Sequence, residues 1–504
     1  MKIKTQDRIV YHSDVIVMNT PVRSLNDLGV EFERYVTQLF EQRYNQTAGL
    51  SYDKELMASL SETIVGLSSE FLNSYKEPRS FYLNSIYQIA EARKLSLSNE
   101  IYEKRMVSIS TKNYRIHKKA VNWGSWRQFN AQSSNSKDRK RIFDDFVEKI
   151  PDLAPLIMKR FNISRQVYSL YDSSPLEAFL EREYLSYEKL YDLILALGDG
   201  ARKPFLQAAN HYAPEILNKE TFEYFDDFYL ARARIYSPLN TYFEKKNPIS
   251  AVKSFLSDWG FEQDFAKIKV DSENREKKSP SAFCFGVEIP NDVRVVFKHV
   301  SPFSDFTSVF HEFGHAIHAT SGNSEDPYWK RYLIPRSVAE TFSIFLEMLL
   351  QYPLFLQQEL GLSEEIIQEV INRRHFMNLY FLVFYSANSL MKLEFWKREY
   401  TLEQASTRFQ ELTKRFFWEI PGDYWLLHHI MPDYDLYSPA YLLASIRVKE
   451  WINEMIDEYG EEFWKEKQAG AVFRDLAATR GEFDLTVWDM DPKLYLEEQS
   501  TFSF

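Results

Sequence analysis

Residues 304–320 read SDFTSVFHEFGHAIHAT, a run in which apolar residues recur at helical spacing around histidines and a glutamate. The segment Ser304 to Thr307 supplies an N-cap and a first turn. The run Ser321-Gly322-Asn323 supplies turn chemistry at the other end. We therefore predict an α-helix across this stretch.

Two of these histidines and the glutamate have the spacing that a metal site requires. Residues four apart share one face of an α-helix, so His311 and His315 can present imidazole nitrogens to one ion. Catalytic zinc accepts neutral imidazole nitrogen and keeps one position for water. Glu312 projects beside the ion, where it can act as general base on that water. The five residues alone are moderately specific, because a helix with two hydrogen-bonded histidines has the same pattern.

A candidate third ligand lies in the segment IPRSVAETFSIFLEMLL at 334–350. Glu340, Ser343 and Glu347 form a polar line on an otherwise apolar helix, which we expect to be buried. A buried carboxylate requires a charge partner or a metal. We therefore predict one Zn²⁺ per chain, bound by His311, His315 and Glu340.

Two further polar residues accompany the predicted ligands. Glu347 lies two turns beyond Glu340 and either accepts a hydrogen bond from a ligand imidazole or forms a buried ion pair with an arginine. His318 shares the His311 face but lies too far along to be a ligand. We interpret it as a packed or groove-lining histidine.

Composition narrows the class of protein. The formal net charge of −11 argues against a nucleic-acid-binding surface, which would need a clustered basic face. The single cysteine, Cys284, excludes an intramolecular disulfide and a cysteine-based zinc site. Residues 1–19 lack the apolar core of a signal peptide, and no stretch approaches about 18 uninterrupted apolar residues. We expect a soluble, cytoplasmic protein that does not bind membranes.

The chain of 504 residues is too long for one compact core, and its pattern changes near the middle. We predict a helical N-terminal lobe at 1–250 and a catalytic zinc-binding lobe at 251–504. From about Ser24 to Tyr242, apolar residues recur at helical spacing. Examples of helical segments are 32–44, 141–150 and 180–197, and breaks are predicted at 131–140, 171–177 and 198–204.

A short β-structure is predicted directly before the helix at 304–320. Residues Phe283 to Ile289 and Val293 to Val300 are rich in β-branched and aromatic types, and Pro290-Asn291-Asp292 joins them. We predict a β-hairpin here. Helical spacing then continues to about Tyr459, followed by a last helical segment at 462–479.

These motifs resemble the thimet oligopeptidase and oligoendopeptidase F family of zinc metallopeptidases. The resemblance covers SDFTSVFHEFGHAIH, then VAETFSIFLEMLL, and more loosely HHIMPDYDLYSPAYLLA at 428–444, while the N-terminal half matches in helix content and length. It implies a mostly α, bilobal, zincin-type fold with a deep central channel. It also implies a metalloendopeptidase that hydrolyses internal bonds of short unstructured peptides. Substrate would add to an edge of the hairpin, at Phe283 to Glu288 or at Val293 to His299.

The resemblance also implies transition-state stabilisers in a loop before a late helix. His429, Tyr434 and Tyr441 stand at the family's spacings, and Ser438-Pro439 fits an N-cap and first helical position. Tyr437 stands one residue from the family's middle tyrosine. It therefore competes with Tyr434 for that role, as His428 competes with His429.

Two other functions are compatible with the same motifs. A carboxypeptidase or dipeptidase would use the same zinc centre and a basic residue, Arg447 or His428, to bind the substrate's terminal carboxylate. A catalytically silent peptide-binding protein would retain the fold alone. The intact Glu312 argues against the silent protein.

Overall fold

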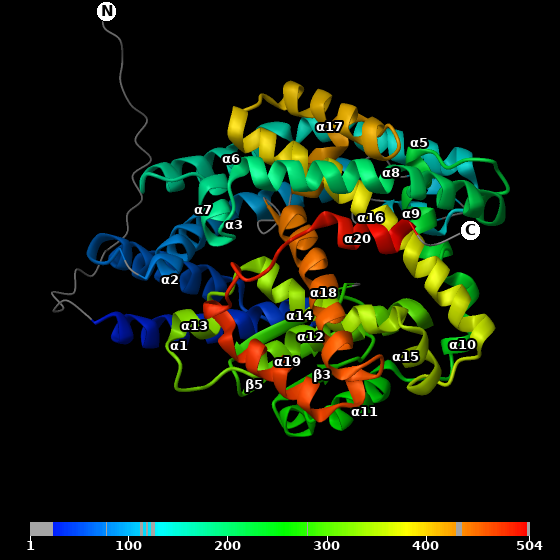
Figure 1. The fold of residues 1–504 in the computed structure, drawn as a ribbon. Coiled ribbons are helices and arrows are strands. Elements are labelled where there is room, and N and C mark those ends of the chain that lie inside the picture. Colours follow the sequence, from blue (N-terminus) through cyan, green and yellow to red (C-terminus); the bar gives the residue numbers. More distant parts are fainter. Residues whose placement is uncertain are drawn as a thin grey trace, which may run out of the picture.

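The computed structural model describes residues 24–76, 78–110, 114–116, 119–121, 126–279, 281–429 and 436–500. Helices dominate this part of the chain, and a small sheet directly precedes the helix of the two histidines (Figure 1). The mostly α fold is therefore confirmed. The α-helices up to residue 258 are α1 (Leu25–Thr47), α2 (Lys54–Ser74), α3 (Arg79–Ser110), α4 (Trp126–Gln132), α5 (Ser136–Val147), α6 (Ala154–Ser169), α7 (Pro175–Arg182), α8 (Tyr187–Leu217), α9 (Asp227–Tyr229), α10 (Asn240–Phe243) and α11 (Pro248–Asp258).

The described residues also contain a β1-β2 pair in the first half and the three-stranded sheet in the second, followed by the later helices. The strands are β1 (Tyr114–Ile116), β2 (Lys119–Val121), β3 (Ile268–Asp271), β4 (Phe283–Glu288) and β5 (Asp292–Val296). The later α-helices are α12 (Pro302–Thr320), α13 (Tyr328–Tyr332), α14 (Arg336–Met348), α15 (Pro353–Gln358), α16 (Glu364–Arg398), α17 (Leu402–Phe416), α18 (Tyr437–Tyr459), α19 (Lys467–Thr479) and α20 (Pro492–Ser500). Figure 1 shows α18 running from the upper helices toward α12, α14 and the sheet.

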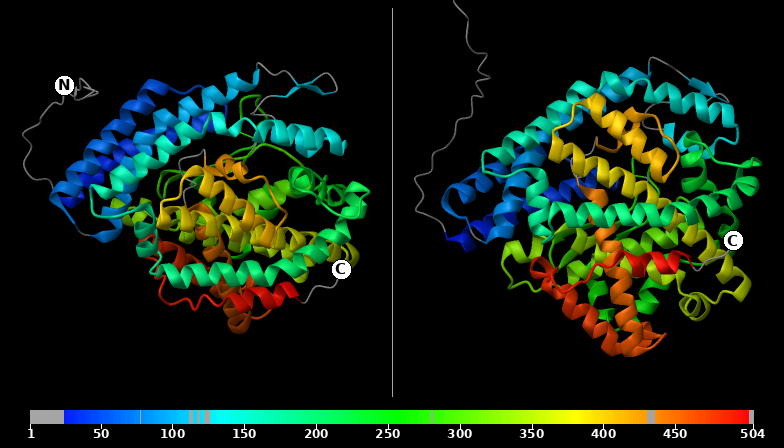
Figure 2. Two further views of the ribbon diagram at one scale, coloured as in Figure 1. Left: turned by 90° about the horizontal axis from the view of Figure 1, so that it is seen from above. Right: turned by 45° about the horizontal axis from the view of Figure 1, so that its top comes forward.

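Three clusters of buried apolar side chains hold these elements together. The α1–α3 helices lie side by side, as both views of Figure 2 show, and supply most of one cluster. A second cluster combines the sheet with α11, α12, α14 and parts of α16, α18 and α19. The third combines residues 101–235 with residues 376–495, so side chains from both sides of residue 250 share it. The lobe boundary at 250 stays a prediction.

The predicted hairpin is confirmed, and it belongs to a larger sheet. Strands β4 and β5 pair antiparallel, with Cys284 opposite Val295, and β3 pairs with β5 in parallel. The strand order β3-β5-β4 makes β5 central and β4 an edge strand. Sequence reasoning missed β3 because its four residues carry too little alternation to be distinguished from a loop.

The helix α12 begins earlier than predicted. Its N-cap is Ser301, so the expected capping residue Ser304 lies within the first turn. Asp305 instead accepts hydrogen bonds from the Val300 backbone N–H and contacts His299 Nδ1 at 2.7 Å. This carboxylate therefore ties the start of α12 to the segment that follows β5. The C-terminal end at Thr320 agrees with the prediction.

The predicted break at 198–204 is wrong, because α8 runs through it without interruption. Its glycines serve close packing between helices. A Cβ atom on Gly198 would lie 2.9 Å from the Phe416 ring, and one on Gly200 would lie 2.5 Å from Leu496. Local sequence cannot distinguish a glycine that ends a helix from one that admits a neighbouring side chain.

The helix predicted at 180–197 is divided in two. Tyr184 adopts a left-handed backbone conformation with φ of 54°, which ends α7. The hydroxyl of Ser186 then accepts the Lys189 N–H and caps α8. A serine N-cap inside an apolar periodic run thus took precedence over the periodicity.

No helix within the described ranges is both long enough and apolar enough to span a bilayer.

The backbones of α12 and α14 approach closely at Gly314, beside the two histidines. A Cβ atom on Gly314 would lie 2.3 Å from the Phe342 carbonyl oxygen and 2.5 Å from Ser343 Cα. Both obstacles are backbone atoms, so neither can move without shifting α14. Only glycine lets the two helices pack at this separation.

We predict that Gly314→Ala lowers the free energy of unfolding by about 1–3 kcal/mol, as overpacking of a tight core does. Denaturant titration measures this change. The matched control is Gly66→Ala in α2, where an added Cβ meets no atom within 4 Å. That substitution should be neutral or stabilise by up to about 1 kcal/mol, because alanine favours helix. Equal stability of the two variants would contradict the packing argument.

Candidate metal centre and active site

The helix α12 presents His311, Glu312 and His315 to one region of the interior. His311 and His315 lie one turn apart, with ring centroids separated by 5.0 Å. Their side chains are about one-fifth exposed, whereas Glu312 is buried. The predicted pairing of the two imidazoles on one helix face is therefore present.

The helix α14 brings Glu340 to the same point. Glu340 Oε2 lies 3.4 Å from His311 Nε2 and 3.8 Å from His315 Nε2. One potential ligand atom from each of the three residues lies within 4.8 Å of the others. Ser343 Oγ is 3.2 Å from Glu340 Oε2 and helps to fix that carboxylate. The three residues that the sequence nominated thus converge.

This donor set fits a transition metal. Two imidazole nitrogens and one carboxylate oxygen are ligands that zinc uses in catalytic centres, with a position left for water. The opposite nitrogen of the first imidazole is already engaged, since His311 Nδ1 lies 3.0 Å from Glu347 Oε2. A carboxylate at Nδ1 keeps the proton there and leaves Nε2 available as a ligand atom.

Glu347 fulfils both roles that the sequence left open. One carboxylate oxygen accepts from His311, and the other accepts from Arg374 NH1 at 2.8 Å. Arg374 lies on α16 and also interacts with Tyr236. A continuous polar chain therefore connects His311 to a buried guanidinium on another helix.

Burial and neighbouring charges shift the pKa values of these groups. Burial raises the pKa of Glu340, but contacts with His311 and His315 outweigh it and lower that pKa to about 2. Burial lowers the pKa of His311, but hydrogen bonds to Glu340 and Glu347 outweigh it and raise the pKa well above its ordinary value. Burial lowers the pKa of His315 to about 4. Without a metal, His311 therefore holds the proton that compensates the carboxylates.

The Glu312 carboxylate extends from α12 to the edge strand β4. Burial raises its pKa to about 7, although the charge of His311 acts in the opposite direction. Its carboxylate accepts a hydrogen bond from the backbone N–H of Cys284 in β4. This contact shows that the unpaired edge of β4 faces the histidine cluster, because that N–H cannot also point to β5.

Tyr441 lies close to the same carboxylates. Burial raises its pKa well above the ordinary value, with further contributions from the charges of Glu347 and Glu340. Its ring packs edge-on against Tyr385 with centroids 5.3 Å apart. A phenol in this state keeps its proton at neutral pH and can donate a hydrogen bond.

The start of α18 differs from the prediction. The N-cap is Leu436, so Ser438 and Pro439 lie inside the first turn. Tyr437 packs against Tyr441 with ring centroids 5.9 Å apart, and the Arg336 guanidinium lies 5.5 Å from the Tyr437 ring. The first residue of α18 therefore lies beside the first residue of the Glu340 helix.

Three nominated side chains lie outside the described part of the structure. They are those of His428, His429 and Tyr434. Their roles stay predictions.

Arg447 is not placed to bind a substrate carboxylate. It is 2% exposed, and NH1 donates to Thr341 Oγ1 at 2.9 Å and to the Ser337 carbonyl oxygen at 3.3 Å. The suggestion that it anchors a terminal carboxylate is therefore wrong. His318 is packed, as one of its two interpretations held, because it stacks on Phe342 with centroids 4.1 Å apart.

Sequence reasoning missed three residues of this centre. Arg374, Tyr385 and Arg336 come from α16 and from the start of α14, and no local motif marks them. The one available signal was the expectation of a buried arginine partner for Glu347. A small hollow between α14, α16 and α18 is lined in part by Glu347, Arg374, Tyr385 and Tyr441.

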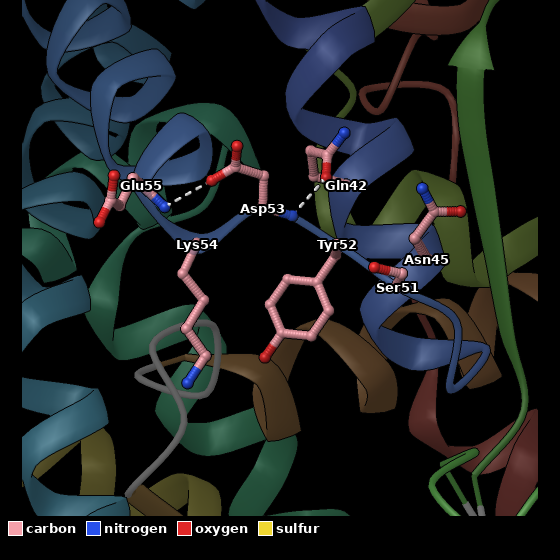
Figure 3. A pocket seen from close by; sticks show the side chains of 7 residues that line it. All are labelled: Gln42, Asn45, Ser51, Tyr52, Asp53, Lys54 and Glu55. Atoms are coloured by element: carbon pink, nitrogen blue, oxygen red, sulfur yellow. Dashed lines mark hydrogen bonds between the residues drawn. The ribbon is translucent and has the colours of Figure 1, made fainter.

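A separate, open depression lies at the connection between α1 and α2 (Figure 3). Its polar groups bond to one another. Asp53 N donates to Gln42 Oε1, and Asp53 Oδ1 accepts the Glu55 N–H, as the dashed lines show. These contacts cap α2, so the depression has a structural explanation.

Comparison with known proteins agrees with this geometry. The model of peptidase family M3 matches residues 250–490, which contain the histidine pair, Glu312 and Glu340. Residues 250–490 therefore belong to peptidase family M3, and this supports a metallopeptidase. The match confirms the family resemblance found in the sequence. A search of curated proteins finds no relative that matches in sequence.

Solved structures share the fold of this chain, including the helices before residue 250. PZ peptidase A with inhibitor 2 is 11% identical, with a TM-score of 0.57 over 97% of this chain and 95% of that one. A protein assigned as an oligoendopeptidase F from Bacillus anthracis str. Ames is 12% identical, with a TM-score of 0.58 over 96% and 93%. Metallocarboxypeptidase 1 from Trypanosoma cruzi is 13% identical, with a TM-score of 0.52 over 94% and 99%. At these identities the likeness shows the fold alone.

We predict that the protein binds zinc more tightly as the pH rises from 6 to 8. The raised pKa of His311 means that the metal-free protein holds a proton there, and a metal ligand must release it. One released proton gives about a tenfold gain in affinity per pH unit while that histidine is protonated. Competition with a chelator at several pH values measures the slope, and a flat profile would contradict the expectation.

Proposed function

We propose that the protein is a zinc-dependent oligopeptidase that cleaves internal bonds of short, unstructured peptides. The observation that carries this proposal is the convergence of His311, His315 and Glu340 beside Glu312 and the edge of β4. A metal-binding group, a buried proton acceptor and an unpaired strand edge are the components that hydrolysis of an extended peptide requires.

The proposed metal is zinc, one ion per chain, held by the two Nε2 atoms and the Glu340 carboxylate. Mixed nitrogen and carboxylate ligation favours zinc among the common divalent metals. When bound, zinc supplies Lewis-acid chemistry, which acidifies water and polarises a peptide carbonyl.

Glu312 is proposed as the general base and then the general acid. Its carboxylate is buried, and its pKa of about 7 lies near the working range of a group that accepts and returns protons. A nearby cation favours the carboxylate form, which is the form that accepts a proton from water. The protonated carboxyl then gives that proton to the leaving amine, and no covalent intermediate forms.

The Tyr441 hydroxyl is proposed to donate a hydrogen bond to the oxyanion of the tetrahedral intermediate. Its pKa is raised by burial, so it stays protonated at neutral pH. Such a bond strengthens as the carbonyl oxygen gains charge. His429 and Tyr434 remain proposed partners in this role, with His428 and Tyr437 as their competitors.

Peptide substrates are proposed to add to β4 as an extra strand. The strand order makes β4, Phe283–Glu288, an edge strand, and its Cys284 contacts Glu312. The alternative edge at Val293 to His299 includes Val293 to Val296 of β5, which is paired on both sides. Main-chain hydrogen bonds there give affinity without dependence on side chains. Together with the central channel implied by the family resemblance, this pairing favours short unstructured peptides.

The proposed location is the cytoplasm. The single cysteine supports this location, because disulfide-forming compartments favour proteins with paired cysteines.

An internal bond is the proposed point of cleavage. A carboxypeptidase needs a cation that meets the substrate's terminal carboxylate, and the buried contacts of Arg447 with α14 remove one of the two nominated anchors. The intact Glu312 supports an active enzyme over a silent binding protein.

We predict that Glu312→Gln retains fold and zinc but lowers kcat by several powers of ten, because the amide cannot transfer a proton. Steady-state kinetics on a fluorogenic peptide and metal analysis measure both quantities. The exposed Glu458→Gln in α18 is the matched control and should keep full activity. Activity near that of the unaltered protein in the Glu312 variant would refute the mechanism.

We predict cleavage of peptides of about five to twenty residues and little cleavage of native globular proteins, because only a single extended chain can pair with a strand edge. Mass spectrometry of products from a peptide series measures this selection. Peptides with an amidated C-terminus should be cut equally well, and a chelator should abolish cleavage. Stepwise loss of C-terminal residues from free peptides alone would favour the carboxypeptidase.

A further inference from the structure

Arg447 ties the helix of Tyr441 to the helix of Glu340. It lies on α18, and its NH1 group donates to Thr341 Oγ1 and to the Ser337 carbonyl oxygen, both on α14. All three residues are buried at 0–2% exposure. These are directional contacts in a helix pair whose packing also includes many apolar side chains and the Arg336–Tyr437 contact.

The acceptors of Arg447 lie on both sides of Glu340. Ser337 precedes it by three residues and Thr341 follows it directly. The Thr341 hydroxyl donates to the Ser337 carbonyl at 2.8 Å while it accepts from Arg447. One guanidinium nitrogen therefore contacts α14 three residues before the carboxylate ligand and one residue after it.

A third helix joins the network through Ser337. Its hydroxyl donates to Glu183 Oε2 at 2.6 Å, and Glu183 is the C-cap residue of α7. Burial lowers the pKa of Arg447 to about 10, while Glu183 acts to raise it, so the guanidinium is charged at neutral pH. Burial raises the pKa of Glu183, although Arg447 and the Ser337 hydroxyl act to lower it. The first turn of α14 is thus held between a carboxyl group of α7 and the guanidinium of α18.

Helical geometry relates these contacts to the active site. Six residues separate Tyr441 from Arg447, which is about 9 Å along α18 and a turn of about 120° to a neighbouring face. Tyr441 and Arg447 both lie on α18. Tyr441 faces the Glu340 and Glu347 carboxylates of α14, whereas Arg447 contacts Thr341 of α14. Apolar contacts are not directional, whereas a buried charged hydrogen bond has a preferred geometry and so constrains the register of the two helices.

We propose that Arg447 is a positioning residue that sets the register of α18 against α14 and thereby holds the Tyr441 hydroxyl opposite the metal ligands. The inference rests on the proposed function, because it assumes that Tyr441 acts in catalysis. Direct contact of Arg447 with substrate is excluded by its burial. Phe483 and Trp488 lie near its guanidinium, with ring centroids 5.7 and 6.0 Å away.

The first experiment removes the contact from either side in the zinc-loaded enzyme. Arg447→Met removes the donor, and Thr341→Val removes one acceptor while keeping the shape of the side chain. Both should lower kcat about 10- to 100-fold, since a displacement near 1 Å can cost that much, with KM changed less than about threefold. Thr341→Ser keeps the hydroxyl and should retain activity within about threefold. Equal loss in the valine and serine variants would overturn the proposal.

The second experiment asks whether the effect passes through Tyr441. Thr341→Val and Arg447→Met are each combined with Tyr441→Phe, and kcat is compared in a double-mutant cycle. If the contact serves to position Tyr441, each substitution should change kcat less than about threefold once the hydroxyl is gone. If the losses multiply in full, the contact stabilises the fold and the proposal falls. The valine variant keeps this test available should Arg447→Met not fold.

A third comparison separates this inference from the proposed function. Should Tyr441→Phe alone keep full activity, the oxyanion role of that hydroxyl and this inference both fail, while the Glu312 and metal assignments stand. Should Tyr441→Phe lower kcat and the cycle show no coupling, only the positioning role fails. Zinc content is measured for every variant, and loss of zinc in Thr341→Val would show that the contact holds Glu340 instead and would overturn the inference.

Discussion

The close approach of α12 and α14 at Gly314 is the constraint on which the site depends. The His311 and His315 rings come from one helix and the Glu340 carboxylate from the other, so their donor atoms meet only if the two backbones nearly touch. A larger side chain at 314 would separate the helices by part of an ångström or more, and carboxylate oxygens would no longer reach both imidazoles. The sheet and α18 then pack around this pair of helices.

Charge compensation explains why polar residues lie along an otherwise apolar helix. Glu312, Glu340 and Glu347 are all carboxylates with little exposure to water, and such groups are costly unless cations or hydrogen bonds accompany them. Arg374 compensates Glu347 from α16, and His311 carries a proton in the metal-free state. A divalent cation would take the place of that proton. The carboxylates of the site therefore supply negative charge that a divalent cation would neutralise.

The sequence predicted those parts of the structure that follow from local periodicity. The helix of the histidines, the ligand helix and the hairpin before them each carry a clear pattern of 3.6 or two residues, and each is present. Errors arose where tertiary contacts decide. The glycines of α8 admit side chains from α16, α17 and α20 instead of ending the helix. The partners Arg374 and Thr341 are far from their contacts in sequence, and the orientation of Arg447 toward α14 could not be read from its own helix.

The largest core of the molecule has a consequence for how the chain reaches this structure during synthesis. Its buried side chains come from residues 101–235 and from residues 376–495, with the last helix packed on α8. The early helices therefore leave the ribosome with apolar side chains whose partners at 376–495 have not yet emerged. At common translation rates of about 5–20 residues per second, those side chains lack these partners for roughly ten seconds or more. Chaperone contact during this interval would therefore affect the yield of folded protein.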